Sequence, residues 1–138
     1  MKYLINEEKN WADECDVRFL EVLDEADKRI FMAAKKVYDN WYSSYYFGTN
    51  EGWEDDFDYL DFDLIELTEE EAAVFKKFHI QGESVFKVLL DMLFDEAVDL
   101  GFAPEGYENE QAFIDKLRSM TEQELEVFFT KMYNEAYQ

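Results

Sequence analysis

The chain has 138 residues, the length of one domain, and its 48% hydrophobic and 18% aromatic content excludes intrinsic disorder. Its 34 Asp and Glu residues against 13 Lys and Arg give a net charge of −21. This charge excludes an ordinary nucleic-acid-binding surface and disfavours docking on anionic membranes. It favours a basic partner, a bound cation or simply high solubility.

The first quarter of the chain is predicted to contain two strands and a helix. Strand patterns occupy residues 2–6 and 17–23, with a polar connection at 7–16 between them. Asp24 is a suitable N-cap for a helix that is expected to end near Tyr42. Apolar residues recur in this helix at a spacing of three and four, which indicates one buried stripe. The stripe consists of Ile30, Ala33, Ala34, Val37 and Trp41.

The next segment repeats this pattern in outline. A third strand is predicted at 45–48 and a fourth at 59–67, and Thr68 with Glu71 forms a capping box for a helix that ends near Phe78. Sliding the chain by 42 residues brings five identical residues into register, so we expect a tandem β-β-α unit in one antiparallel sheet. Chance similarity within an acidic, aromatic composition is the alternative. The five residues Tyr3, Trp11, Asp13, Asp16 and Lys35 align with Tyr45, Trp53, Asp55, Asp58 and Lys77.

From Gly82 onward the pattern is helical. Helices are predicted at 84–100, closed by Gly101, and at 109–120, and Thr121 with Glu124 forms a second capping box for the last helix. The predicted fold class is therefore α+β, with a small antiparallel sheet followed by a C-terminal segment of three helices. We expect residues 1–138 to form a single domain, with the order β-β-α-β-β-α over 1–80 and helices over 81–138.

Few residues point to catalysis. His79 is the only histidine and lies at the predicted end of a helix, where an imidazolium interacts favourably with the helix dipole. Cys15, the only cysteine, is flanked by Glu14 and Asp16, which raise a thiol pKa and favour a small buried residue over a nucleophile. We therefore predict no catalytic residues, no cofactor and no enzymatic activity.

A dedicated metal site is not predicted either. The run that begins at Asp55 offers hard oxygen ligands that suit Ca²⁺ or Mg²⁺, but it lacks the order of an EF-hand loop. Phe57, Tyr59 and Leu60 occupy positions where that loop needs oxygen ligands or glycine. Because Cys15 stands alone and the N-terminus shows no signal peptide, we expect a cytoplasmic protein.

The distribution of charge is more informative. Residues 37–75 contain twelve acids and no Lys or Arg, and residues 88–114 contain seven acids and no base. Folding brings these like charges closer together, and their repulsion costs stability. We therefore infer that the fold uses the resulting negative electrostatic potential. We name the densest part, residues 51–71, the acidic segment, and predict that its carboxylates bind a partner. They are Glu51, Glu54, Asp55, Asp56, Asp58, Asp61, Asp63, Glu66, Glu69, Glu70 and Glu71.

In charge and size the chain resembles the DNA-mimic anti-defence proteins of phages and mobile elements, the antirestriction and anti-CRISPR inhibitors. The acidic segment and the net charge of −21 carry the resemblance. It implies a basic, nucleic-acid-binding partner protein, such as an effector or nuclease, and no direct contact with nucleic acid or membrane. The alternative is an acidic interaction or immunity-type protein whose basic partner is unrelated to DNA. The oligomeric state is left open.

Overall fold

A computed structural model describes residues 2–11, 15–46, 60–78 and 85–136, and every structural statement below concerns these residues. Side chains are described for 2–5, 21–37, 64–78, 86–87 and 89–136. The fold class is α+β, as the sequence predicts.

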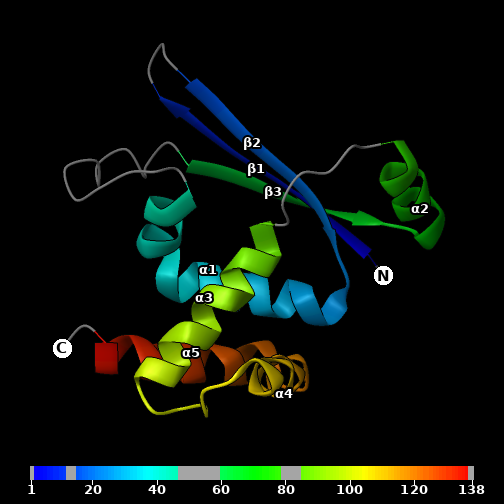
Figure 1. The fold of residues 1–138 in the computed structure, drawn as a ribbon. Coiled ribbons are helices and arrows are strands. Elements are labelled where there is room, and N and C mark those ends of the chain that lie inside the picture. Colours follow the sequence, from blue (N-terminus) through cyan, green and yellow to red (C-terminus); the bar gives the residue numbers. More distant parts are fainter. Residues whose placement is uncertain (1, 12–14, 47–59, 79–84, 137–138) are drawn as a thin grey trace. The chain divides into compact units, whose positions relative to one another are not determined.

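The chain divides into two compact units, and helix α1 contributes to both (Figure 1). Unit 1 comprises Met1–Glu25 and Asp39–Ser84, and unit 2 comprises Ala26–Tyr38 and Val85–Gln138. That residues 1–138 form a single domain stays a prediction.

Unit 1 contains a three-stranded antiparallel sheet in the order β2-β1-β3, with β1 in the centre (Figure 1). Tyr3 lies opposite Leu23 on β2, and Ile5 lies opposite Leu64 on β3. Because opposite positions of an antiparallel pair share a face, the buried residues Tyr3, Ile5 and Leu23 form one apolar side at this end of the sheet. The strands are β1 (Lys2–Trp11), β2 (Cys15–Leu23) and β3 (Leu60–Leu67).

The predicted polar connection at 7–16 is wrong. Strand β1 continues to Trp11 and β2 begins at Cys15, so only residues 12–14 between them lie outside the described part. The sequence prediction stopped at Asn6 because the charged residues that follow have low strand propensity. Pairing on both sides of β1 overrides that preference: Glu8, for example, lies opposite Arg18 on β2 and Asp61 on β3.

Helix α1 (Glu25–Tyr46) is longer than predicted. Tyr45 and Tyr46, which the sequence placed in a third strand, are helical, so that prediction is wrong for these two residues, and residues 47–48 lie outside the described part. Aromatic residues suit strands, but here they continue a helix that is already formed, and extending a helix is easier than starting a strand. The described order is therefore β-β-α-β-α, and it does not match a tandem β-β-α repeat.

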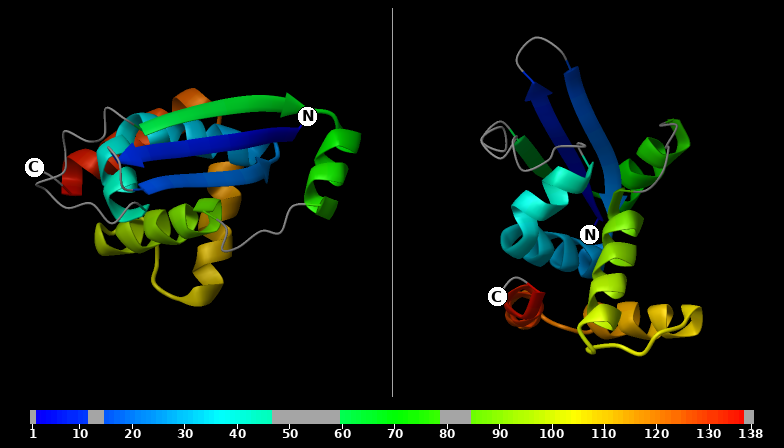
Figure 2. Two further views of the ribbon diagram at one scale, coloured as in Figure 1. Left: turned by 90° about the horizontal axis from the view of Figure 1, so that it is seen from above. Right: turned by 60° about the vertical axis from the view of Figure 1, so that its left-hand side comes forward.

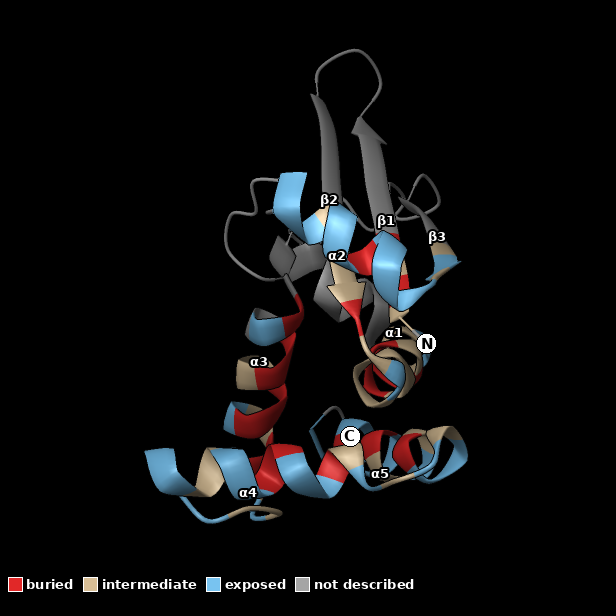
Figure 3. Ribbon diagram, turned by 90° about the vertical axis from the view of Figure 1, so that its right-hand side faces the viewer, coloured by how far each residue is buried: buried red, intermediate tan, exposed pale blue. Residues whose placement is uncertain are grey.

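Helix α2 (Glu69–Phe78) follows β3 directly, as the capping box predicts (Figure 2). It contacts β1 and β3, and Ala72 is its buried residue. The small side chain of Ala72 lets the helix backbone approach the sheet, while most of the other side chains are exposed (Figure 3).

Unit 2 is helical and holds most of the buried side chains that the structure describes (Figure 3). The buried stripe of α1 is confirmed at Ile30, Ala33 and Ala34, whereas Val37 is half-buried and the side chain of Trp41 lies outside the described set. The predicted C-terminal helices are confirmed, although the middle one begins and ends two residues earlier than expected. They are α3 (Val85–Asp99), α4 (Tyr107–Arg118) and α5 (Glu122–Ala136).

Aromatic rings connect the helices of unit 2. Phe94 on α3 packs against Phe113 on α4 with ring centroids 5.7 Å apart. Phe128 on α5 continues the chain of rings, with its centroid 6.2 Å from Phe113 and 5.9 Å from Phe102. Such pairs contribute about 0.5–1.5 kcal/mol beyond the burial of their area. This end of the core is therefore held by ring contacts between three helices.

The helix ends follow the sequence signals. Gly101 has φ +81°, and the N–H of Phe102 donates to the carbonyl of Ala97 at 2.7 Å, which makes the C-terminal cap of α3 a Schellman motif. At the start of α5 the Thr121 N–H donates to Glu124 at 3.0 Å and the Glu124 N–H to the Thr121 hydroxyl at 3.1 Å. Both predictions are confirmed. Such caps can be predicted from the sequence because each depends on a few neighbouring residues.

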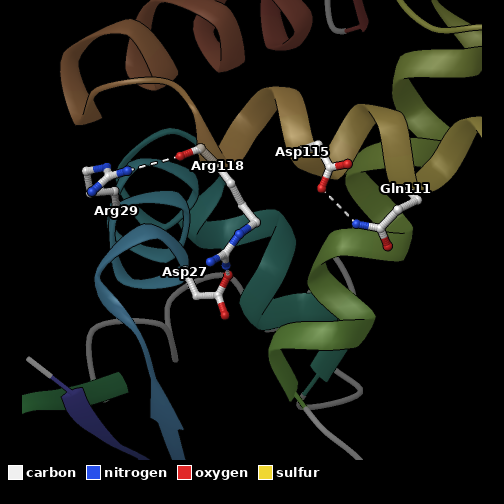
Figure 4. Close-up of polar contacts among 5 residues, drawn as sticks. All are labelled: Asp27, Arg29, Gln111, Asp115 and Arg118. Carbon is white, nitrogen blue, oxygen red and sulfur yellow. Dashed lines mark hydrogen bonds and ion pairs between the residues drawn. The ribbon is translucent and has the colours of Figure 1, made fainter.

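Polar contacts tie the part of α1 in unit 2 to the end of α4 (Figure 4). Arg29 donates from Nε to the Met120 carbonyl at 3.2 Å and from one terminal nitrogen to the Arg118 carbonyl at 3.0 Å. Arg118 in turn forms an ion pair with Asp27 on α1. Carbonyls at a helix C-terminus lack intrahelical donors, so Arg29 supplies the missing hydrogen bonds.

A candidate acidic partner-binding surface

The structure describes the second half of the acidic segment. Asp61 and Asp63 lie in β3, and their side chains are outside the described set. Glu66, at the end of β3, is exposed. Exposed carboxylates also occupy the first turn of α2, namely Glu69, Glu70 and Glu71. The remaining predicted residues, Glu51, Glu54, Asp55, Asp56 and Asp58, lie outside the described residues.

Pairing with β1 fixes the backbone of β3. Asp61 lies opposite Glu8, and Asp63 lies opposite Asn6. Glu66 lies opposite Tyr3, whose hydroxyl donates to Glu25 Oε2 at 2.7 Å. That hydrogen bond, burial and the nearby carboxylates of Glu25 and Glu66 raise the pKa of Tyr3. The sheet thus holds Glu66 at a defined place next to a buried tyrosine ring.

The capping box fixes the turn from β3 into α2. The Thr68 N–H donates to Glu71 Oε1 at 2.9 Å, and the Glu71 N–H donates to the Thr68 hydroxyl at 3.1 Å. The positive end of the helix dipole stabilises the acids in this turn. Glu71 therefore has a structural task, and Glu69 and Glu70 are the carboxylates of this turn that suit contact with a partner.

The charge reverses within α2. Lys76 and Lys77 occupy its last turn, and Lys77 Nζ lies 5.6 Å from the centroid of the Phe78 ring. Lys77 follows Glu70 by seven positions, which is roughly 10 Å along a helix axis. Along α2, the acids thus occupy the first turn and the lysines the last.

Three exposed apolar side chains of β3 and α2 were missed by the sequence reasoning. Ile65 is 46% exposed, Val74 is 56% exposed and Phe78 is 75% exposed. Val74 and Phe78 are four residues apart and share one side of α2. Ala72, the buried residue of the helix, lies off that side. Exposed apolar groups next to charge are typical of contact surfaces.

Unit 2 carries a second group of exposed acids on α3, the following loop and α4. Its members are Asp95, Asp99, Glu105 and Glu108. Burial and the neighbouring Asp99 carboxylate raise the pKa of Glu96. These residues belong to the second stretch without Lys or Arg, residues 88–114, and they serve as a comparison for the acidic segment.

An open apolar groove of about 500 Å³ lies along α5. Phe128 and Val127 form part of its lining, and Lys131 borders it with Nζ 5.4 Å from the centroid of the Phe102 ring. Glu124 also lines the groove, but its carboxylate accepts the hydrogen bond of the capping box, which lowers its pKa. The groove therefore offers mainly apolar surface.

Two further residues named in the sequence analysis have no described side chain. His79 lies outside the described residues, and Cys15 is placed only by its backbone in β2. Within the described ranges, no group of three or more His, Cys, Asp or Glu side chains is arranged to hold a metal ion. None of the described helices is long and apolar enough to span a membrane.

Comparisons with protein families, curated proteins and solved structures gave no match for this chain.

Proposed function

We propose that the protein is a non-enzymatic inhibitor of the DNA-mimic type, which occupies a basic, nucleic-acid-binding surface of a partner protein with its acidic segment. The observation that supports this most is the exposure of Glu66, Glu69 and Glu70 on a strand, a capped turn and a helix whose backbone positions are fixed. Carboxylates on a fixed backbone present a negative potential without the entropy cost of ordering a flexible chain on binding.

Two further properties support the proposal. The net charge of −21 steers the protein toward basic surfaces, which increases the rate of association at low salt. Duplex DNA carries one negative charge per roughly 1.7 Å of its axis, so a channel that binds DNA attracts a dense row of carboxylates as well. Val74, exposed four positions after Glu70 on the same side of α2, adds apolar contact area for a partner.

A pull-down from a bacterial lysate at low salt tests the proposal with two matched triple variants. The binding variant carries Glu66→Gln, Glu69→Gln and Glu70→Gln and keeps Glu71 for the helix cap. We expect it to retain about tenfold less of the captured partner, which corresponds to about 0.5 kcal/mol for each carboxylate.

The control variant carries Asp95→Asn, Asp99→Asn and Glu105→Gln, which are exposed in unit 2. It removes the same charge, so we expect it to capture the partner as the wild type does. Equal losses in both variants would show that net charge alone drives capture, and the proposal for this surface would then fail.

The alternative, a basic partner unrelated to DNA, makes the same prediction for these variants. The two proposals differ in the identity of the captured protein and in competition by DNA. A nucleic-acid-binding partner that releases the protein when duplex DNA is added supports the mimic, whereas capture that DNA leaves unchanged supports the alternative.

A further inference from the structure

Strand β3 has a free edge among the described elements. It pairs with β1 on one side, and Figure 2 shows it as an outer strand of the sheet. In an antiparallel ladder, successive residues direct their N–H and C=O groups to alternate sides of the strand. Every second residue of β3 therefore directs these groups away from β1, where no described strand pairs with them.

This edge is long and regular. Each of the eight residues Leu60–Leu67 lies opposite one residue of β1 within residues 2–9, so no bulge interrupts the register. Natural sheets protect exposed edges with lysine, proline, bulges or very short strands. The sequence of β3 contains no Lys, Arg, Pro or Gly, and β3 is longer than the common length of about five or six residues. The edge is thus suited to pairing with a further strand.

The charge of β3 determines which strand can pair there. Its charged residues are Asp61, Asp63 and Glu66, all acidic. If a second copy of the chain paired its own β3 antiparallel over the full length, Asp61 of each copy would lie opposite Glu66 of the other. Like charges directly opposite each other destabilise a strand pair, whereas Lys and Arg opposite the acids stabilise it. The edge therefore disfavours a second copy and favours a basic strand.

Strand β2 forms the other edge of the described sheet and is less selective. It carries Arg18 as well as the acids Asp16 and Glu21, so its charges are mixed. Strand β3 also offers an apolar contact, because Ile65 is 46% exposed. Charge complementarity with a basic strand is thus greater at β3 than at β2.

We propose that the free edge of β3 binds an extended basic segment of the partner protein, which adds to the sheet as a strand antiparallel to β3. This inference rests on the proposed function and specifies how the partner engages the acidic segment. In strand addition, backbone hydrogen bonds supply affinity and the opposing side chains supply specificity. Nucleic-acid-binding proteins carry extended basic segments as arms, which makes them partners of the right chemistry.

A synthetic peptide tests the proposal without an identified partner. The probe is the blocked octapeptide Val-Lys-Val-Val-Lys-Val-Lys-Val, which places lysine opposite Glu66, Asp63 and Asp61 when it runs antiparallel to β3. NMR titration of the full chain at about 0.1 M salt measures its affinity, and we expect the shifted amides to be those of β3. The same peptide with glutamate in place of lysine should bind about tenfold more weakly. A basic probe that does not bind, or that binds no better than the acidic one, overturns the proposal.

N-methylation of the probe separates strand addition from simple charge attraction. A strand added to an edge uses the N–H groups of alternate residues only. Of two probes methylated at either the odd or the even positions, one should therefore lose binding and the other should keep it. Both keep their lysines, so charge attraction alone would treat them alike. Strand addition is overturned if both methylated probes bind or if both fail.

Ile65→Lys tests the edge from the side of the protein. Lysine at an exposed edge position repels the lysines of the probe, so we expect about fivefold weaker binding. Val127→Lys is the matched control, because Val127 is 67% exposed on α5 and the change adds the same charge. The probe should bind this variant as it binds the wild type. Equal weakening in the two variants would show that net charge decides the affinity, and the β3 site would be wrong.

The probe experiments and the pull-down can fail separately. If the variant with Gln at positions 66, 69 and 70 captures the partner as the wild type does, the proposed function fails, whereas the result with the methylated probes still decides strand addition. If the two methylated probes behave alike, strand addition fails, and the pull-down still decides the proposed function.

Discussion

Arg29 shows how one residue can hold two helices. Its guanidinium donates to two carbonyls at the C-terminal end of α4, Arg118 and Met120, and the side chain of Arg118 returns to Asp27. Its planar group reaches both carbonyls at once, and a lysine has no equivalent fork of donors. Nothing in the sequence distinguishes Arg29 from the neighbouring Lys28, because the partners are some ninety residues away in the chain.

Replacing Arg29 with Met is expected to lower the free energy of unfolding by about 2 kcal/mol, because hydrogen bonds from a charged donor are lost and carbonyls at a helix end are left unsatisfied. Urea denaturation measures the loss. Lys36→Met is the control on the same helix: it breaks the exposed ion pair with Glu126, 3.0 Å long, and should cost less than 1 kcal/mol. Equal losses in the two variants would contradict the role of Arg29.

At the scale of elements, local signals predicted the structure well. The capping boxes at Thr68 and Thr121 and the cap at Gly101 each depend on a few adjacent residues, and the structure confirms all three. The helical stripes were also predictable, because burial follows the period of the helix. The ends of β1 and α1 were not, since they depend on pairing and helix extension, in which distant residues override local preference.

The two capping boxes should have different effects when they are removed. Thr121→Ala loses the cap of α5, which carries the buried residues Leu125, Phe129 and Met132, so we expect the global free energy of unfolding to fall by about 1 kcal/mol. Thr68→Ala loses the cap of α2, whose buried residue is Ala72. Its effect should be confined to faster hydrogen exchange in α2, because weakly packed elements open locally.

Hydrogen exchange followed by mass spectrometry, together with urea denaturation, separates the two outcomes. A fall in global stability on Thr68→Ala as large as that on Thr121→Ala would show that α2 unfolds with the rest of the molecule. Such a result would place α2 in the core that unfolds as one unit. It would contradict our inference from the exposed side chains of α2.

The candidate site was predictable only in part. Composition located the acidic segment, because charge runs are visible without a structure. It did not separate the structural Glu71 from Glu69 and Glu70, since that distinction depends on the hydrogen bonds of the cap. Nor did it find the ion pair of Lys87 with Glu110, which meet only through the packing of α3 against α4.

At the scale of the whole molecule, the proposed binding to a basic partner depends on net charge. A charge of −21 costs stability through self-repulsion and is compatible with folding because the helices bury a large apolar core. The same field attracts basic surfaces and is screened by salt over about 10 Å at 0.1 M. Binding by the acidic segment should therefore weaken steeply as the ionic strength rises.

Competition with duplex DNA tests the central claim most directly. The immobilised protein is loaded with its captured partner at low salt, and duplex DNA is added in increasing amounts at constant ionic strength. We predict that the added DNA releases the partner, and that the amount released increases with the affinity of the DNA for the partner. An equal charge of free inorganic phosphate should not release it. A partner that remains bound at saturating DNA, on a surface distinct from its nucleic-acid site, would contradict the account.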